Sequence, residues 1–221
     1  RRKNSPLIAP CQLLAFGEFT LFEYNGKYTI NEAHCLELFS GLRRELTQLS
    51  LGSYFAQVTE LISQEDMPNP ELQSLLLNCL YALSKLGLPE AQVKVVFELR
   101  AACLAGYTPE LFGCHICGCQ TPERFDLSLG QLECKGCRDP QSAGIRVPVT
   151  LEMLEAMRYI CLCAPKRLFS FRLGEEAIQA LSQLTEGYLQ TQLERGFSAL
   201  DFYKSLFVRE AFLGEKHDGI V

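Results

Sequence analysis

Two cysteine pairs, CHIC at residues 114–117 and CKGC at residues 134–137, interrupt a sequence otherwise dominated by helical periodicity. Two residues separate the cysteines within each pair, and 16 residues separate the pairs. This spacing lets two tight turns direct four thiolates at one ion, and Gly118 and Gly136 permit such turns. The pattern therefore predicts one structural Zn2+ ion per chain, bound by Cys114, Cys117, Cys134 and Cys137.

Two alternatives to this ligand set stay open. The four cysteines could instead form disulfides or remain inert thiols, and Cys119 and His115 are close enough in sequence to compete as ligands. Because Cys119 would have to replace Cys117 and break the two-residue spacing, we expect it to be a spare thiol. Four protein ligands leave no coordination position for water, so the predicted zinc is structural rather than catalytic.

Helical patterns flank the cysteine-rich segment on both sides. Before it, three-four spacing of apolar residues begins at about Ala33. A second helix is expected from Pro70, capped by Asn69, to Leu86, and a third from Pro89 to Gly106. After it, helices are expected over 150–163, 174–195 and 198–208, the first of them capped by Thr150. The predicted division is therefore 1–32, a helical domain over 33–106 and 150–221, and a zinc-binding insertion at 107–149.

Residues 17–32 predict a β-hairpin around a tight Asn25-Gly26 turn. Its strands are rich in aromatic residues, and Lys27 follows the turn. Aromatic faces next to cations are typical of proteins that bind single strands without sequence preference. The alternative, which we prefer for most of these aromatic side chains, is that they form the core of a small barrel.

Charge is unevenly distributed along the 221 residues. Residues 1–44 contain six Lys or Arg and four Glu, a net charge of +2. The remaining residues contain 15 Lys or Arg and 22 Asp or Glu, a net charge of −7. The cations of the first segment, which are the candidate nucleic-acid contacts, are Arg1, Arg2, Lys3, Lys27, Arg43 and Arg44. For Arg43 and Arg44, a solvated helix face is an equally good interpretation.

Several classes of protein are disfavoured. Apolar residues make up 48% of the chain, which is ordinary globular composition, and no apolar run approaches the roughly 20 residues that span a membrane. No signal peptide, phosphate-binding glycine loop or nucleophile motif is visible, and the three histidines are scattered, so we expect no enzyme. The seven cysteines outside the two pairs, such as Cys79, Cys103 and Cys161, are expected to be small buried hydrophobic residues in a reducing cytoplasm.

The order of several short segments resembles the bacterial RecO family of recombination mediators, over nearly the whole chain. These segments are RRKNSP at 1–6, GEF at 17–19, YTI at 28–30, PNPEL at 68–72, FELR at 97–100, GYTPEL at 106–111 leading into the first cysteine pair, and RGFSALDF at 195–202. The resemblance implies an α+β, mostly α protein: an N-terminal OB-fold, then a helical domain with a zinc-knuckle insertion. Residues 1–32 would be the C-terminal part of that OB-fold, with its first strands upstream of Arg1.

The resemblance also implies a function. Family members anneal single-stranded DNA and help load the RecA recombinase onto DNA coated by single-strand binding protein (SSB). The implied partners are single-stranded DNA, RecR and, as a further candidate, the C-terminal tail of SSB, and the implied location is the bacterial cytoplasm at the nucleoid. The hypothesis from another class is a zinc-stabilised interaction adaptor without a direct DNA role, which the acidic remainder of the chain favours. A zinc hydrolase would require an open metal site.

Overall fold

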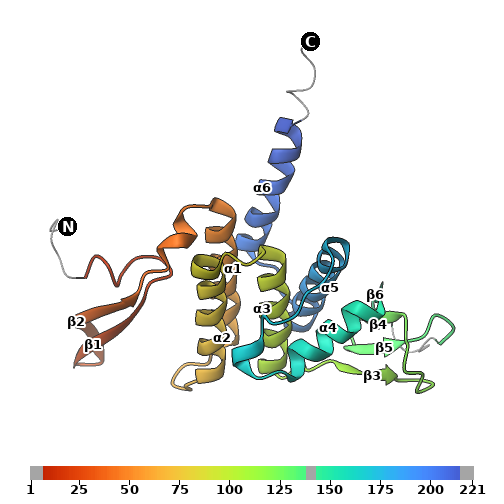
Figure 1. Cartoon of the computed structure of the whole chain (residues 1–221). Helices are drawn as coiled ribbons and strands as arrows, with labels where there is room; N and C mark the ends of the chain where they lie inside the picture. Colours follow the sequence, from red (N-terminus) through yellow and green to blue (C-terminus); the bar gives the residue numbers. More distant parts are fainter. Residues whose placement is uncertain (1–6, 138–142, 215–221) are drawn as a thin grey trace, which may run out of the picture.

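The structure, a computed structural model, describes residues 7–137 and 143–214 (Figure 1). The helical elements are α1 (Leu46–Ile62), α2 (Pro70–Tyr81), α3 (Glu90–Leu104), α4 (Leu151–Leu162), α5 (Glu175–Leu193) and α6 (Ser198–Gly214), with short helical turns η1 (Ser40–Arg43), η2 (Ala82–Leu86) and η3 (Pro165–Arg167). The strands are β1 (Phe16–Tyr24), β2 (Lys27–Glu37), β3 (Glu110–Cys114), β4 (Arg124–Asp126), β5 (Gln131–Glu133) and β6 (Arg146–Pro148). The described chain is thus α+β and mostly helical.

Helix α3 is the centre of the helical body. It packs against α1, α2, α4 and α5, and it is buried on most of its circumference because its apolar residues are not confined to one stripe. Phe97 of α3 stacks on Phe55 of α1 with ring centroids 4.1 Å apart, and Tyr54 meets Phe197 edge-on at 5.4 Å. These contacts tie the first half of the chain to the segment that begins α6.

A charged network crosses this core. Lys94 and Glu98, one helical turn apart on α3, are 2% and 0% exposed and approach to 2.9 Å. Lys94 also lies 2.9 Å from Glu186 of α5, whose other carboxylate oxygen lies 2.7 Å from Lys204 of α6. Burial of charged groups is tolerated only when they are paired and hydrogen-bonded, so this network fixes how α3, α5 and α6 meet.

The N-terminal hairpin forms around the expected turn. Asn25 and Gly26 adopt φ values of 50° and 70°, as a type I′ turn requires. Strand β2, however, runs on to Glu37, and the first α-helix begins only at Leu46, so the helix expected from Ala33 was wrong. The reason is pairing: Gly17 lies opposite Cys35, and a Cβ at Gly17 would sit 2.5 Å from the carbonyl oxygen of His34. That close approach carries the ladder past residue 33.

Several other sequence predictions of helix ends are confirmed, but the last helix, expected over 198–208, runs on to Gly214. The side chain of Asn69 caps α2 by accepting from the amide of Leu72, with Pro70 at the first helical position. Thr150 caps α4 in the same way, through the amide of Met153. Gly87 ends the helical run that α2 begins, at a φ of 60°, although the last turn widens into the π-type turn η2.

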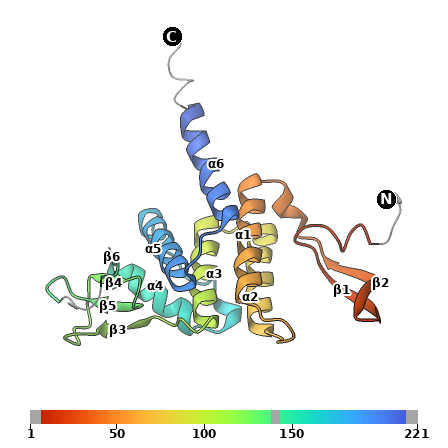
Figure 2. The same ribbon diagram turned by 180° about the vertical axis from the view of Figure 1, so that it is seen from behind.

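Two small β-structures lie on opposite sides of the helical body (Figures 1 and 2). One is the β1–β2 hairpin, which projects away from α1 and α2. The other is the cysteine-rich insertion, a four-stranded sheet of order β3-β5-β4-β6 that lies beside α4 and α5. Among the described residues the hairpin is a two-stranded sheet and closes no barrel. No helix in the described ranges has both the length and the apolar character needed to cross a membrane.

Candidate metal centre and nucleic-acid interface

The structure brings the four predicted cysteines together. Cys114 ends β3, Cys117 follows in a turn that Gly118 closes at a φ of 73°, and Cys134 comes directly after β5. The Sγ atoms of these residues and Cys137 all lie within 4.8 Å of one another, and those of Cys117 and Cys134 are 3.7 Å apart. Parallel pairing of β3 with β5 places the two pairs side by side, because one pair starts at the last residue of β3 and the other directly after β5.

The cluster has the dimensions of a tetrahedral thiolate site. Four sulfurs at about 2.3 Å from one zinc ion lie about 3.8 Å from each other, which agrees with the separation of Cys117 and Cys134. Burial raises the pKa of Cys114, but hydrogen bonds from the amides of Cys117, Cys134 and Ile116 outweigh it and lower the pKa to about 6. Backbone donors therefore stabilise a thiolate there, the form that binds metal. The cluster can hold a metal ion and is compatible with zinc.

Cys119 and His115 lie outside the group of four. The Cys119 thiol is exposed and lies 3.6 Å from the hydroxyl of Thr121. The His115 ring contacts a carboxylate: its Nε2 lies 3.4 Å from Oε1 of Glu133. The Cys119 thiol also hydrogen-bonds to Cys134, so its role as a spare thiol stays a prediction, and His115 has a carboxylate partner.

A buried ionic network supports the second cysteine pair. Glu133, next to Cys134, is fully buried, and Arg146 of β6 donates to its two carboxylate oxygens at 2.7 and 3.3 Å. Arg146 also lies 3.6 Å from the buried Asp126 of β4. Sequence reasoning missed this network because its members are spread over three strands. The available signal was that each acid follows one apolar residue, Phe125 or Leu132, at the end of a three-residue strand, and a buried acid needs a cation.

The insertion is joined to the helices by packing and by hydrogen bonds. The Phe125 ring, fully buried, meets Tyr188 of α5 edge-on at 5.2 Å. The side chain of Gln192 donates to the carbonyl oxygens of Leu127 and Ser128 at 2.8 and 3.0 Å, and Arg158 of α4 donates to that of Leu111 at 2.7 Å. The metal cluster therefore lies at the outer end of a sheet whose inner end is anchored.

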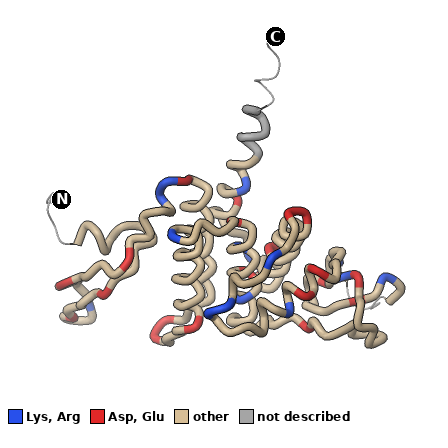
Figure 3. Tube along the Cα trace, viewed as in Figure 1, with Lys and Arg blue, Asp and Glu red and all other residues tan. Residues whose placement is uncertain are grey.

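The candidate nucleic-acid contacts are only partly placed. Lys27 is exposed at the tip of the hairpin, and Arg44 is exposed beside η1. Arg43 has a structural role as well, because its guanidinium donates to the carbonyl oxygens of Leu38 and Leu13, both at 2.7 Å. The remaining candidates, Arg1, Arg2 and Lys3, lie outside the described residues. In Figure 3 the hairpin carries acidic as well as basic positions.

The hairpin aromatics are exposed. Phe19, Phe22, Tyr24 and Tyr28 have 43%, 61%, 69% and 69% of their surface accessible, so among the described residues they do not form a barrel core. No second layer covers either face of these two strands within the described residues, so the barrel core stays a prediction. By contrast, Cys79 is fully buried as expected, whereas Cys103 and Cys161 are half-buried.

The fold and these sites define a class of protein: a helical body with a four-cysteine insertion able to hold a metal on one side and an exposed aromatic hairpin on the other. Comparisons with known proteins make the assignment specific. The family described as "Recombination protein O C terminal" matches residues 43–201. A curated protein from Acetivibrio thermocellus, named DNA repair protein RecO, is 31% identical over 93% of this chain and 82% of its own length.

Two further relatives agree. Proteins of the same name from Alkaliphilus metalliredigens and Listeria monocytogenes are 27% and 23% identical, over 93% and 95% of this chain and 84% and 77% of theirs. The chain therefore belongs to the RecO family, as its resemblance predicted, and its role lies in DNA repair and recombination.

Proposed function

We propose that this chain is a non-enzymatic recombination mediator that binds and anneals single-stranded DNA and helps load RecA onto SSB-coated DNA. Family membership supports the repair role. The observation that carries DNA binding is one face of the hairpin, on which exposed aromatic rings and a cation lie together.

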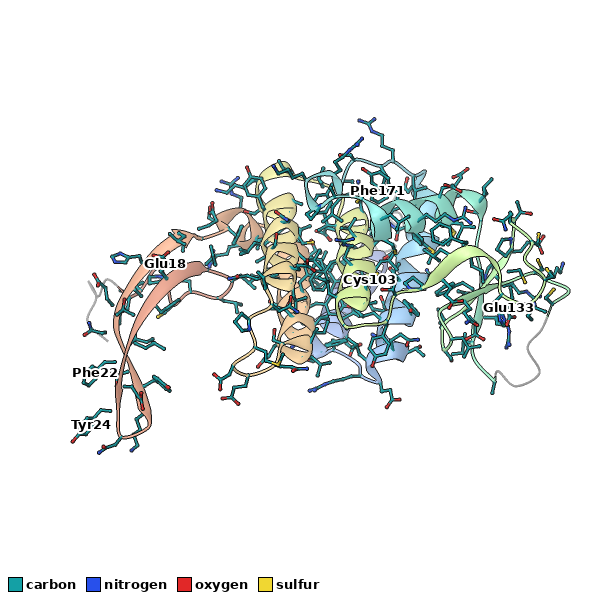
Figure 4. The ribbon with its side chains drawn as sticks, turned by 90° about the horizontal axis from the view of Figure 1, so that it is seen from below. Glu18, Phe22, Tyr24, Cys103, Glu133 and Phe171 are labelled. Atoms are coloured by element: carbon teal, nitrogen blue, oxygen red, sulfur yellow. The ribbon has the colours of Figure 1, made fainter. Side chains whose placement is uncertain are left out.

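That face follows from the register of the hairpin. Phe22 pairs with Thr29 and Tyr24 with Lys27, and directly opposed residues project from the same face of a sheet. Phe22 and Tyr24 are alternate residues of β1, so both rings and the ammonium group share that face. Figure 4 shows the two labelled rings projecting to the same side of the ribbon. Exposed rings stack on bases at about 1–3 kcal/mol per base, with little sequence preference.

The opposite face fits the interior of an OB-fold. It carries Phe19, Leu21, Ile30 and Ala33, which are paired across the strands as Phe19 with Ala33 and Leu21 with Ile30. The same face also carries the pair of Glu23 and Tyr28 near the turn. An isolated two-stranded hairpin is marginal in water, and a largely apolar face is typical of one that packs on further strands. We propose that β1 and β2 are part of such a barrel, with the Phe22 face outward.

Phosphate neutralisation requires more cations than Lys27. The hairpin itself also carries Glu18, Glu23, Glu32 and Glu37. We propose that Arg1, Arg2, Lys3 and Arg44 supply the additional charge and that Arg43 contributes mainly by holding the base of the hairpin. DNA affinity should then fall as salt rises, with a slope that reflects the number of phosphates contacted.

We propose Zn2+ as the ion of the four-cysteine cluster. Zinc bound by four thiolates joins the two turns that follow β3 and β5, and it leaves no open position for chemistry. RecR is the proposed protein partner and the C-terminal tail of SSB a second one. The competing function, an adaptor without a direct DNA role, is favoured by the acidic charge of residues 45–221.

The decisive experiment is a titration of labelled single-stranded DNA at two salt concentrations. Phe22→Ala with Tyr24→Ala should weaken binding about tenfold or more, and Tyr28→Ala, on the opposite face, is the matched control. Changing Arg1, Arg2 and Lys3 together to Ala should reduce the salt slope. Binding that is unaffected by the double change rejects this face. A RecR pull-down that survives complete loss of DNA binding in a variant with intact repair favours the adaptor.

A further inference from the structure

Two half-buried thiols meet where α3 approaches α4. The Sγ atoms of Cys103, in the last turn of α3, and Cys161, in the last turn of α4, are 3.8 Å apart. A disulfide bond is about 2.05 Å long, so a shift of about 2 Å separates this contact from a covalent bond. Figure 4 places Cys103 at the end of α3 that leads into the insertion. The sequence separation of these residues had hidden their proximity.

The pair is chemically asymmetric. The hydrogen bond that Cys103 shares with the Cys161 thiol is the main cause that lowers the pKa of Cys103 to about 7, helped by the Thr108 hydroxyl and the Arg100 charge and opposed by burial. The pKa of Cys161 is raised well above its usual value, first by its bond to Cys103 and then by burial. Arg100 is held in place because it donates to the carbonyl oxygens of Cys161 and Ile160 at 2.8 and 3.4 Å.

Access distinguishes these thiols from an inert one in the same helical body. Cys103 and Cys161 are both partly exposed, whereas Cys79 is 0% exposed and burial raises the pKa of its thiol. Reactivity of a cysteine requires both thiolate character and contact with solvent. Cys103 has both, and its partner thiol is already in place.

We propose that Cys103 and Cys161 form a peroxide-responsive thiol pair that closes a reversible disulfide between α3 and α4. The Cys103 thiolate attacks one oxygen of hydrogen peroxide, the O–O bond breaks, and water leaves after protonation, which gives a sulfenic acid at Cys103. The Cys161 sulfur then attacks the Cys103 sulfur. The S–S bond forms, the S–O bond breaks, and the hydroxide leaves as water with the Cys161 proton. Peroxide is reduced by two electrons, and a dithiol reductant reverses the reaction.

The position of the bond gives it a consequence. Residues 103 and 161 bracket the insertion and most of α4, so the disulfide joins the chain just before the insertion to the helix that follows it. Closing such a long loop restricts the unfolded chain and stabilises the folded one. Oxidation is therefore expected to raise the melting temperature by a few degrees and to slow opening of the base of the insertion. This site is independent of the DNA-binding face.

The test is peptide mapping of the zinc-loaded whole chain after a mild hydrogen peroxide pulse and thiol blocking. The expected product is a disulfide-linked pair of peptides that contain Cys103 and Cys161 and that disappears after dithiol treatment. A chromogenic zinc chelator, read in parallel, shows whether the four-cysteine cluster has reacted. A map in which both thiols stay free while the exposed Cys11 is oxidised overturns the proposal, and so does a link from Cys103 to any other cysteine.

Three variants sharpen the result. Cys161→Ser should leave Cys103 as a sulfenic acid that a cyclic dione reagent labels, and Cys103→Ser should slow oxidation of Cys161 by about tenfold or more. Cys163→Ser, in the same half-buried neighbourhood, is the matched control and should still form the bond. Loss of the bond in this control, with helicity unchanged by circular dichroism, would contradict the assignment. The wild-type map decides the matter if a serine variant does not fold.

Discussion

The hairpin and the insertion are both small β-structures that extend from the helical body, but they treat their side chains in opposite ways. The insertion buries Phe125 and Leu132 completely and encloses an ionic network, whereas the hairpin leaves almost every side chain between Glu18 and Glu32 exposed. The insertion thus contributes to the stability of the body, and the hairpin offers its side chains to something else. The region proposed to bind DNA therefore buries fewer side chains than the region proposed to hold a metal.

The largest expected effect is on the folding stability of the insertion. Removing the metal with a chelator, or Cys134→Ala, should remove more than about 5 kcal/mol of the insertion's folding free energy, because ligand binding and local folding are coupled. The measurements are hydrogen exchange at residues 110–134 and thermal melting, both on protein whose metal content has been determined. Cys11→Ala is the control, since this exposed thiol lies far from the cluster in sequence and outside the group of four. A melting temperature that does not change when the chelator is added would contradict metal binding at this cluster.

A second prediction compares one aromatic residue from each region. Phe125→Ala should cost about 4 kcal/mol of unfolding free energy because it empties a fully buried site against Tyr188. Phe22→Ala should change the same quantity by less than about 0.5 kcal/mol because that ring is 61% exposed. Urea denaturation of both variants measures the contrast. Equal losses would mean that the two regions do not differ in the way their exposures imply.

Third, Arg146→Met should destabilise the insertion by about 3 kcal/mol. The change removes the guanidinium that donates twice to Glu133 and lies beside Asp126, two fully buried acids. Arg146→Lys keeps the charge but loses the planar fork, so its cost should be intermediate. Denaturation at constant metal concentration tests both variants. If Met is tolerated as well as Arg, the network contributes packing rather than charge compensation.

How far the sequence predicts each region follows from where its information lies. The cysteine cluster and the hairpin turn are local: two residues between ligands, or Asn25-Gly26, suffice to specify them. The end of β2 is not local, since it depends on the close approach of Gly17 to His34, across the ladder. The partners of Glu133 and the contact between Cys103 and Cys161 depend on how strands and helices pack, and no short spacing encodes that.

Arg43 shows the same limit for a candidate site residue. From sequence, two adjacent arginines fit a DNA contact or a solvated helix face equally well. The structure separates them, because Arg43 donates to the carbonyl oxygens of Leu38 and Leu13 whereas Arg44 is exposed beside it. Those carbonyl groups belong to the segments that enter and leave the hairpin. One charge of the pair therefore stabilises the junction, which composition cannot reveal.

The smallest expected effect concerns that junction. One carboxylate oxygen of Glu37 accepts from the amides of Leu38 and Phe39 at 2.9 and 3.0 Å and lies 3.4 Å from Lys85. The amide of Phe39 is the main cause that lowers the pKa of Glu37 below its usual 4.5, helped by Lys85 and opposed by partial burial. Because the folded-state pKa is lowered, the Glu37 carboxylate stabilises the junction at pH values above its unfolded-state pKa. That stabilisation is lost as the pH falls through the folded-state pKa.

Glu37→Gln should therefore cost less than about 1 kcal/mol at pH 7, and the difference from wild type should shrink as pH falls below 4.5. The measurement is an NMR titration of the Glu37 carboxyl with amide exchange at Phe39. Glu32→Gln, on the same strand and paired with His34 instead, is the control. A titration midpoint at or above 4.5 would show that the amides do not hold the carboxylate, and the hairpin would then be attached even more loosely than its hydrogen bonds indicate.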